Sequence, residues 1–333
     1  MTSPWLREKA ISPIFSPRGV KSVAEGLNIS SLLRGRTASS DQAQPLRQIV
    51  GDEKGQPLRT FAVVSGKGGV GKTNLAVNLS LAFCERGQRV VLLDADLGLA
   101  NVDILFGLLP PAVTLAHVIE GERTLDEALL KLHEGFWLIP GGAGVQELAD
   151  LEERRQGLLI EEFSRLDERA DVLLIDTAAG LHASVLAFAL AADSVILVTT
   201  PEPTAIRDAY GVLKVLARRS NGRIDVRLIV NMVRDEAEAQ EVGRRFQMAA
   251  AQFLNVPVIF AGHVSRDDRV HDAVARQRPL LWAFPDSKAA RNVRLVASRI
   301  LPAPSSEEEL VAAPSRGLKG FLFRLSRRVG LGG

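Results

Sequence analysis

The stretch FAVVSGKGGVGKTN, residues 61 to 74, decides the fold of this chain of 333 residues. Within it the pattern G-x-x-x-x-G-K-[ST] runs from Gly66 to Thr73, after a strand-like apolar run and before a helix-like one. Glycines in such a pattern let backbone N–H groups turn toward phosphate oxygens, and the following helix offers the positive end of its dipole. The stretch therefore predicts a phosphate-binding loop between a strand and a helix, with nucleotide contacts from Gly66, Lys67, Gly68, Gly69, Val70, Gly71, Lys72, Thr73 and Asn74.

Two lysines lie in this loop, and the general pattern explains only one of them. Lys72 stands where a cation reaches the terminal phosphates of a nucleotide, and the hydroxyl of Thr73 is a ligand for Mg²⁺. Lys67, directly after the first glycine, has no such role in the general pattern. A functional assignment therefore has to explain the second lysine.

Three aspartates follow apolar strand-like runs, at the positions where ligands bind in open α/β sheets. Asp176 ends the run VLLID, and Asp94 and Asp96 lie two residues apart in VVLLDAD. Residues two apart on a strand point to the same face, so both carboxylates can approach one cluster of metal and water. A plain turn-capping role for Asp94 or Asp96 stays open.

Apolar runs alternate with helical stretches from residue 58 onward. Near-continuous apolar strands separated by helices indicate a parallel sheet covered on both faces. We predict an α/β fold with a doubly wound, mostly parallel sheet of about seven to eight strands flanked by helices. The strand candidates are TFAVVS, RVVLLDAD, FWLIPG, DVLLIDTA, SVILVTT, VRLIVNMV and VPVIFAGHV.

Two segments give local signals for helices. The run from residue 181 to residue 200 is nearly long enough to span a bilayer, but Ala191–Ala192–Asp193 divides it into a helix-like half and a β-branched half. It therefore predicts a helix followed by a strand in a protein core. In TLDEALLK, Thr124 and Glu127 have the spacing of a capping box and predict a helix start.

Composition excludes several classes of protein. The 41 Lys and Arg nearly balance the 39 Asp and Glu, and a formal net charge of +2 argues against a surface built as a whole for nucleic acid. The single cysteine, Cys84, excludes an internal disulfide framework and an iron–sulfur site that needs paired cysteines, and it indicates a reducing compartment. Charge and proline interrupt MTSPWLREKAISP before an apolar run forms, so we expect no secretory signal.

The late strand-like run IVNMVRDE bears on the choice of base. Asn231 stands where guanine-binding proteins have the asparagine of an N-K-x-D motif, but Met232 follows it in place of the lysine. The sequence therefore favours adenine over guanine.

Together, KGGVGKT, LLDADLGLANVD, LLIDTAAG, TTPEPTAIRDAY and IVNMV resemble the MinD/ParA family of deviant-Walker ATPases, over roughly residues 58 to 300. The resemblance implies a P-loop NTPase fold of the SIMIBI class and Mg²⁺-dependent hydrolysis of ATP to ADP and phosphate, slow and stimulated by a partner. It also implies an ATP-dependent homodimer, in which Lys72 serves its own nucleotide and Lys67 reaches the nucleotide of the other subunit.

The same resemblance implies roles for the site residues. The catalytic residues are Lys67, Lys72 and Asp96, with Asp96 orienting the attacking water. The Mg²⁺ site is formed by Thr73, Asp94 and Asp176, and Asn231 contacts adenine. Ala178 stands where many relatives have proline. Alanine makes this turn less rigid than proline would and leaves the neighbouring carboxylate in place.

The C-terminal sequence GLKGFLFRLSRRVG has the pattern of an amphipathic helix. Apolar side chains fall on one face of the helical wheel and basic ones away from it, which is typical of a helix lying on an anionic membrane surface. Docking of this helix on its own domain stays open, because amphipathicity does not identify the apolar partner. The predicted membrane residues are Leu318, Phe321, Leu322, Leu325 and Val329, with Lys319 and Arg324 as cations.

The segment DQAQPLRQIV resembles the N-terminal element of the FlhG type of flagellar-number regulators within the same family, as does the middle of the chain. The resemblance implies an FlhF-type GTPase and flagellar switch proteins as partners. The amphipathic tail argues against nucleic acid as a partner. The resemblance also places the protein in the cytoplasm and, with ATP bound, peripherally on the inner face of the cytoplasmic membrane. The partner-binding residues are Asp41, Gln42, Ala43, Leu46 and Arg47.

These features divide the chain into four parts: an N-terminal extension over 1–57 with a partner-binding segment at 39–50, an ATPase domain over 58–301, a linker over 302–315 and a membrane-targeting tail over 316–333. Three functions other than the flagellar one stay open. A division-site ATPase like MinD has the same chemistry with another partner. A DNA-partitioning ATPase like ParA has a basic face for DNA, and the amphipathic tail argues against it. A metabolic P-loop enzyme needs an acceptor-substrate motif, and none is visible in the sequence.

Overall fold

The computed structural model of the chain describes residues 58–96, 102–142, 162–163, 165–301, 320–322 and 324–325. The predicted extension 1–57, with its partner-binding segment 39–50, and the predicted linker 302–315 lie outside these residues. Most positions of the predicted tail also lie outside them.

Eight strands form one sheet in the order β3-β4-β2-β5-β1-β6-β7-β8. Neighbouring strands are parallel except for β3 and β4 at one edge. The predicted doubly wound, mostly parallel sheet is therefore confirmed. The strands are β1 (Arg59–Ser65), β2 (Val90–Ala95), β3 (Leu130–His133), β4 (Phe136–Ile139), β5 (Val172–Ala179), β6 (Ser194–Thr199), β7 (Val226–Val233) and β8 (Val258–Ser265).

Helix boundaries follow from local signals in the sequence. Asp235 and Ser287 cap their helices by accepting the backbone N–H groups of Glu238 and Ala290. Pro203 opens its helix in the first turn, where a missing N–H breaks no helical hydrogen bond. The helices are α2 (Lys72–Cys84), α3 (Val102–Leu105), α4 (Leu115–Ile119), α5 (Leu125–Ala128), the 3₁₀ helix η3 (Arg165–Glu168), α7 (Ala183–Ala191), α8 (Pro203–Arg219), α9 (Glu236–Leu254), α10 (Asp268–Ala275), α11 (Leu280–Ala283) and α12 (Lys288–Ile300).

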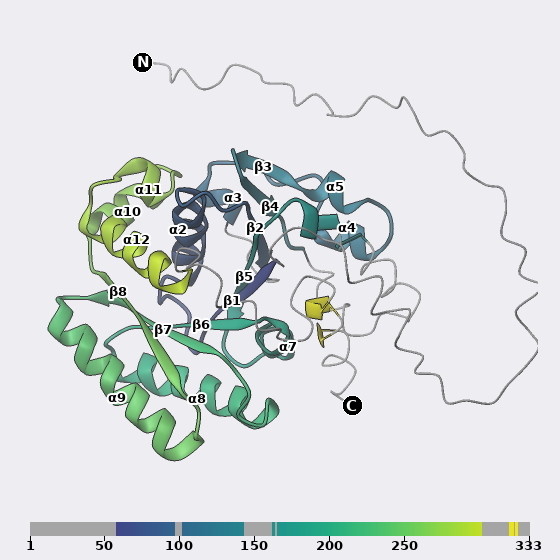
Figure 1. Ribbon diagram of the computed structural model, residues 1–333. Helices are drawn as coiled ribbons and strands as arrows, with labels where there is room; N and C mark the ends of the chain where they lie inside the picture. The colour runs from purple at the N-terminus through teal and green to yellow at the C-terminus, as the bar shows by residue number, and fades with distance from the viewer. Residues whose placement is uncertain are drawn as a thin grey trace, which may run out of the picture. The chain divides into compact units, whose positions relative to one another are not determined.

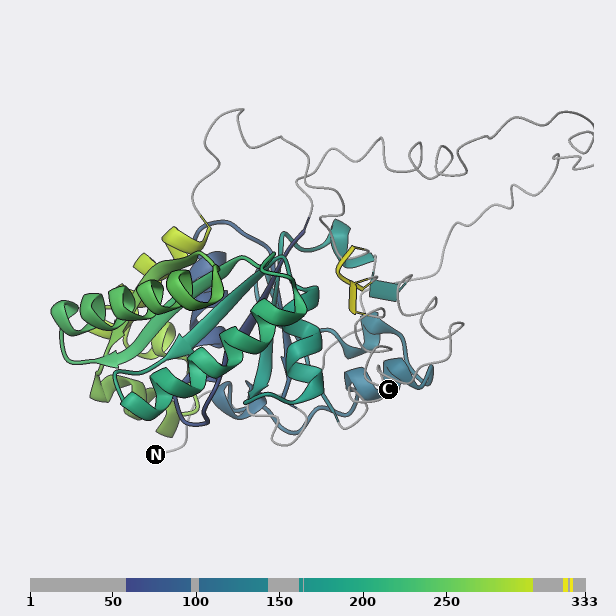
Figure 2. The same ribbon diagram turned by 90° about the horizontal axis from the view of Figure 1, so that it is seen from below.

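Helices cover the sheet from both sides, so the central strands are buried on both faces. Every residue of β2 and of β6 is buried. Helices α2 and α12 pack on one side, and α7, α8 and α9 pack on the other (Figure 1). Figure 2 shows the second layer from below, with its long helices lying across the strands. Strands enclosed in this way need the near-continuous apolar sequences that the chain supplies.

The edge strand β3 is an element that the sequence analysis misses. The predicted capping box is present, because Glu127 N donates to Thr124 Oγ1 at 3.3 Å and Thr124 N donates to Glu127 Oε2 at 2.8 Å. The helix that it opens nevertheless ends at Ala128, and the chain continues as β3 antiparallel to β4. Four residues of alternating exposure are too short a pattern to predict a strand without its neighbour.

The apolar run over residues 181 to 200 divides as predicted, into α7 and β6. Asp193 lies in the break, where its Oδ2 accepts hydrogen bonds from Thr60 N at 2.9 Å and Thr60 Oγ1 at 2.7 Å. This polar contact fixes the break against β1. No helix among the described residues has both the length and the apolar content needed to cross a membrane.

Cys84 is a free, partly buried thiol. Its Sγ donates to Gly135 O at 3.4 Å, and burial raises the pKa of the thiol to about 12. A thiol with so high a pKa forms almost no thiolate near neutral pH and is therefore unreactive.

Apolar residues of the predicted tail are buried against the domain. Phe321, Leu322 and Leu325 are 1%, 7% and 5% exposed and join the core formed with β5 and α7. Phe321 stacks on Phe188 of α7, with the ring centroids 6.5 Å apart. In this structure the described part of the apolar face therefore meets the chain's own core, which is the alternative to lipid that the sequence leaves open.

A polar contact fixes the end of the described tail. Arg324 Nε donates to Ala191 O at 2.7 Å, and Arg324 Nη2 donates to Asp193 Oδ1 at 2.8 Å. Asp193 thus holds β1 with one carboxylate oxygen and the tail with the other. The other predicted membrane residues, Leu318, Lys319 and Val329, lie outside the described residues.

Candidate functional site

The phosphate-binding loop forms between β1 and α2, where the sequence predicts it. Gly66 lies so close to α8 that a Cβ there would be 2.2 Å from the carbonyl carbon of Asp208. Gly71 caps α2 with a φ of 84°, which favours glycine. Close backbone packing therefore requires glycine at position 66, and the positive φ favours it at position 71. Lys72, Thr73 and Asn74 form the first turn of α2.

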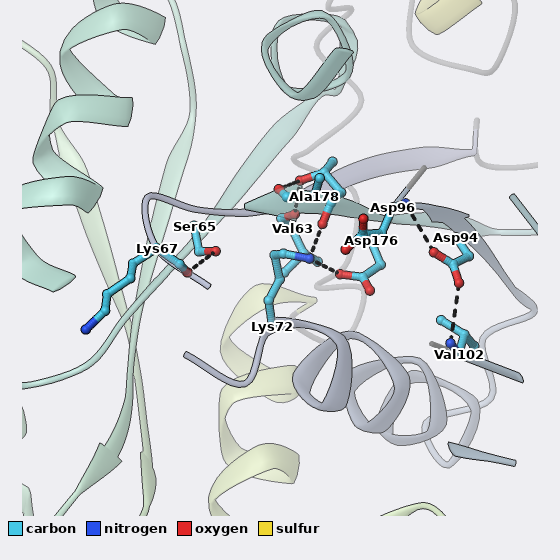
Figure 3. Close-up of polar contacts among 10 residues, drawn as sticks. Val63, Ser65, Lys67, Lys72, Asp94, Asp96, Val102, Asp176 and Ala178 are labelled. Carbon is cyan, nitrogen blue, oxygen red and sulfur yellow. Dashed lines mark hydrogen bonds and ion pairs between the residues drawn. The ribbon is translucent and has the colours of Figure 1, made fainter. Parts of the chain in front are cut away.

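Lys72 is buried and paired with a carboxylate. Its Nζ donates to Asp176 Oδ1 at 2.8 Å and also to the carbonyl oxygen of Thr177 (Figure 3). The side chains of Lys72 and Asp176 are 7% and 0% exposed. Burial raises the pKa of Asp176, and the positive charge of Lys72 offsets part of that rise. The sequence pattern predicts that both residues lie at the site, but it does not predict that they pair.

The predicted cluster of aspartates forms at the carboxyl ends of β2 and β5. Asp94 Oδ1 accepts the backbone N–H of Asp96 at 3.2 Å, and Asp94 Oδ2 accepts that of Val102 at 3.3 Å (Figure 3). Asp94 lies directly opposite Asp176 in the strand register. Burial and the neighbouring Asp176 charge raise the pKa of Asp94 to about 7. The structure thus brings together Asp94, Asp96 and Asp176 as predicted.

This set of oxygen donors fits a hydrated Mg²⁺. Asp176 Oδ2 is buried and has no hydrogen-bond partner among the described residues. In the same part of the chain, no three His, Cys, Asp or Glu side chains lie close enough to hold a metal ion by themselves. Mg²⁺ keeps several waters and is usually bound through one or two carboxylates and substrate phosphates. Thr73, Asp94 and Asp176 are the residues that would hold it together with a nucleotide.

Lys67 points away from Lys72 and the carboxylates (Figure 3). Its Nζ lies 2.8 Å from Glu202 Oε2 and 3.4 Å from Thr204 Oγ1, at the start of α8. Lys67 and Glu202 are 42% and 64% exposed. The second lysine is therefore available at the surface. The sequence predicts no role for Glu202 or Thr204, because a contact between residues 135 positions apart leaves no local pattern.

Asn231 lies against the phosphate-binding loop. Its Nδ2 donates to Val70 O at 2.8 Å, and its Oδ1 accepts the N–H of Met232 at 2.9 Å. Both polar ends of the amide are thus used within the chain, and Asn231 ties β7 to the loop. The predicted contact of Asn231 with adenine stays a prediction. The predicted partner residues, Asp41, Gln42, Ala43, Leu46 and Arg47, lie outside the described residues.

Comparison with known proteins identifies relatives of this architecture. The family described as "CobQ/CobB/MinD/ParA nucleotide binding domain" matches residues 61–280. The antiactivator FleN of Pseudomonas aeruginosa is 42% identical over 269 residues, covering 81% of this chain and 94% of that protein. The flagellum site-determining protein YlxH of Helicobacter pylori is 31% identical over 285 residues, covering 84% of this chain and 93% of that protein.

Solved structures show the same fold. The cell division ATPase MinD of Pyrococcus furiosus is 26% identical with a TM-score of 0.58, covering 73% of this chain and 98% of that one. The septum site-determining protein MinD of Pyrococcus horikoshii, complexed with Mg-ADP, is 27% identical with a TM-score of 0.57, covering 74% of this chain and 96% of that one. The predicted resemblance to MinD/ParA proteins and to their flagellar branch is confirmed.

Asp94 makes the stability of the protein without nucleotide and Mg²⁺ depend on pH. Its pKa of about 7 in the folded state exceeds its ordinary value of 3.8, so between these values the folded chain holds a proton that the unfolded chain releases. The contribution is complete below about pH 4 and is lost as the pH rises through about 7. A difference of about three units corresponds to at most about 4 kcal/mol in the free energy of unfolding.

We therefore expect the stability of Asp94→Asn relative to the parent to rise between pH 4 and pH 8, on top of a constant loss from the one oxygen that no longer accepts a backbone N–H. Urea unfolding between pH 4 and 8, with EDTA present, measures the difference. Asp171→Asn is the control, because partial burial of Asp171 is outweighed by hydrogen bonds from Arg89, and its pKa is lowered. A stability difference between Asp94→Asn and the parent that is the same at every pH would contradict the prediction.

Proposed function

Because the chain belongs to the CobQ/CobB/MinD/ParA family of nucleotide-binding domains, we propose that it is an ATPase that dimerises with ATP and regulates the number or placement of flagella. The observation that carries the proposal is a loop with two lysines of opposite orientation. Lys72 is buried beside Asp176, whereas Lys67 lies at the surface and points away from that pair. Such a loop suits two nucleotides, one in each subunit of a pair.

In the proposed mechanism Lys72 exchanges Asp176 for the terminal phosphates of its own ATP. Thr73, Asp94 and Asp176 would hold a hydrated Mg²⁺, which would neutralise charge on the phosphates. Asp96 orients the attacking water, and its backbone hydrogen bond to Asp94 fixes it relative to the metal side of the site. The Mg-ADP named for the Pyrococcus horikoshii protein supports this choice of ligands.

Dimerisation requires Lys67 to leave its present partner. The ion pair with Glu202 is largely exposed, and exposed pairs stabilise a protein by only about 0–1 kcal/mol. A triphosphate of the neighbouring subunit offers Lys67 several negative charges, so it competes well with one carboxylate. Lys67 thereby makes assembly depend on the nucleotide of the partner.

The proposal predicts different effects for three substitutions. Asp96→Ala stops hydrolysis and should be a stable dimer with Mg-ATP. Lys67→Ala in that background should still bind ATP and remain monomeric, whereas Lys72→Ala should lose ATP binding. Light scattering measures the assembly and titration with a fluorescent ATP analogue measures the binding. An Asp96→Ala protein that stays monomeric with saturating ATP at high concentration would contradict the proposal.

The flagellar role is proposed from the relatives and from the N-terminal segment. FleN is named an antiactivator and YlxH a flagellum site-determining protein, and each alignment covers more than nine tenths of the relative. We propose that the segment 39–50 stimulates an FlhF-type GTPase and that flagellar switch proteins are further partners. Proteins named septum site-determining MinD are also similar, one of them 39% identical over 181 residues, so division-site positioning is the second candidate function.

A partner assay separates these two functions. The full chain should accelerate GTP turnover by an FlhF-type GTPase several-fold. Replacing Asp41 and Gln42 by alanine should remove that effect without changing ATP hydrolysis by the chain itself. Asp52→Ala, just outside the segment, is the matched control. Equal stimulation by the parent and the double variant would exclude the segment as the activating element.

We propose that the tail, residues 316–333, attaches the cytoplasmic ATP-bound dimer to the inner face of the membrane. In the monomer Phe321, Leu322 and Leu325 are buried on the domain, so they must leave it before they meet lipid. Burial of such a side chain stabilises by about 1.5–3 kcal/mol in either place, so the two states are close in free energy. In a dimer, the binding of one tail holds the second tail at a high effective concentration near the membrane, so the dimer binds the membrane more tightly than the monomer does.

The ion pair of Arg324 with Asp193 should oppose attachment. Asp193→Asn weakens that pair, and we expect more of the nucleotide-free variant than of the parent to sediment with anionic vesicles. Deletion after Arg316 should abolish sedimentation and leave ATP binding intact. Asp171→Asn, which removes a carboxylate paired with Arg89, is the control. Vesicle binding that survives the deletion would refute the membrane role of the tail.

A further inference from the structure

Met232 has an unusual backbone conformation beside the phosphate-binding loop. Its φ is 59°, in the left-handed region that a residue with a Cβ rarely adopts. Among the described residues only Asn221, Asn255 and Gln277 share this feature without being glycine. Asparagine tolerates the left-handed region better than methionine does, so Met232 is the more strained case.

The surroundings hold Met232 in this conformation. Its N–H donates to Asn231 Oδ1, and the same amide donates to Val70 O of the loop. The pairing of β7 with β8 shifts register at this point, between Asn231 and Val233. The loop and the sheet thus impose the strain together, and strain maintained in this way is often part of a functional site.

The conformation presents an apolar side chain next to the loop. Met232 is 42% exposed. Its terminal methyl group lies 3.4 Å from the position that a Cβ on Gly71 would take, beside the first turn of α2. On the adjacent strand end, the buried hydroxyl of Ser265 has no hydrogen-bond partner among the described residues. An apolar surface and an unsatisfied hydroxyl therefore lie at the ends of β7 and β8.

The sheet order indicates what this surface meets. The carboxylates Asp94 and Asp176 stand on β2 and β5, on one side of the loop strand β1, whereas β7 and β8 lie on the other side. Terminal phosphates and Mg²⁺ belong on the side of the carboxylates. A nucleotide held by the loop therefore extends its sugar and base toward β7 and β8.

We propose that the Met232 side chain is the platform on which the base of the bound nucleotide rests. A polarizable thioether makes favourable contacts with aromatic rings, and methionine adds no charged group that would favour the oxygen of guanine. This inference rests on the proposed binding of ATP and assigns a residue that contacts its base. Asn231 is then a positioning residue, which holds both the loop and the platform.

Binding of ATP and of inorganic tripolyphosphate, each with Mg²⁺, tests the proposal by calorimetry. Met232→Gly removes the platform and relieves the backbone strain. We expect its affinity for ATP to fall by about two- to tenfold, its affinity for tripolyphosphate to stay unchanged, and its melting temperature without nucleotide to be no lower. Met232→Leu keeps an apolar surface and should retain most of the affinity. Gln277→Gly, at the other long side chain with positive φ, is the control and should not change ATP binding.

Three outcomes would overturn the assignment. Equal losses of affinity for ATP and tripolyphosphate would show that Met232 acts on the loop. Unchanged ATP affinity with loss of the ATP-dependent dimer would assign Met232 to the contact between subunits. A parent chain that binds tripolyphosphate but has no preference for ATP over it would exclude any base platform, and a parent that binds neither would refute the proposed function itself.

Discussion

The buried pairing of Lys72 with Asp176 is the interaction on which the rest of the site depends. Both groups are almost fully removed from water, and taking one partner from such a pair typically destabilises a protein by about 3–5 kcal/mol. The pair joins the start of α2 to β5, and β5 lies between β1 and β2. It therefore holds the phosphate-binding loop next to Asp94 before any nucleotide arrives. An incoming phosphate meets Lys72 already removed from water and positioned. The phosphate then replaces the Asp176 carboxylate as the anion next to Lys72.

The order of the strands separates two tasks of the site. On one side of β1 the carboxylates gather at the ends of β2 and β5, where burial and mutual repulsion raise the pKa of Asp94. On the other side the ends of β7 and β8 carry the amide of Asn231, the thioether of Met232 and the hydroxyl of Ser265. In the proposed function, hydrolysis and base recognition occupy opposite sides of one loop, so the residues for one can change without displacing those for the other.

Local patterns were enough to predict the loop, the cluster of aspartates and every strand except β3, because each depends on residues close together in the sequence. The contacts that join distant segments were not predictable in this way. Lys67 meets Glu202, and Asn231 meets the carbonyl of Val70, across 135 and 161 positions. The partner of the tail could not be predicted for a different reason, because an amphipathic face has the same sequence whether it covers lipid or protein. Its burial beside Phe188 depends on a surface formed only after the sheet and α7 have folded.

The two contacts of Asp193 connect the nucleotide site with the tail. One of its oxygens holds Thr60 in β1, the strand that runs into the phosphate-binding loop, and the other holds Arg324 in the tail. Coupling between two binding events is reciprocal: whatever factor one ligand applies to the affinity for another, it receives in return. If a bound triphosphate raises the affinity of the tail for a bilayer, then binding of the tail to a bilayer must raise the affinity for the triphosphate by the same factor. The lipid surface is then an allosteric effector of the nucleotide site, as well as the place to which the protein is recruited.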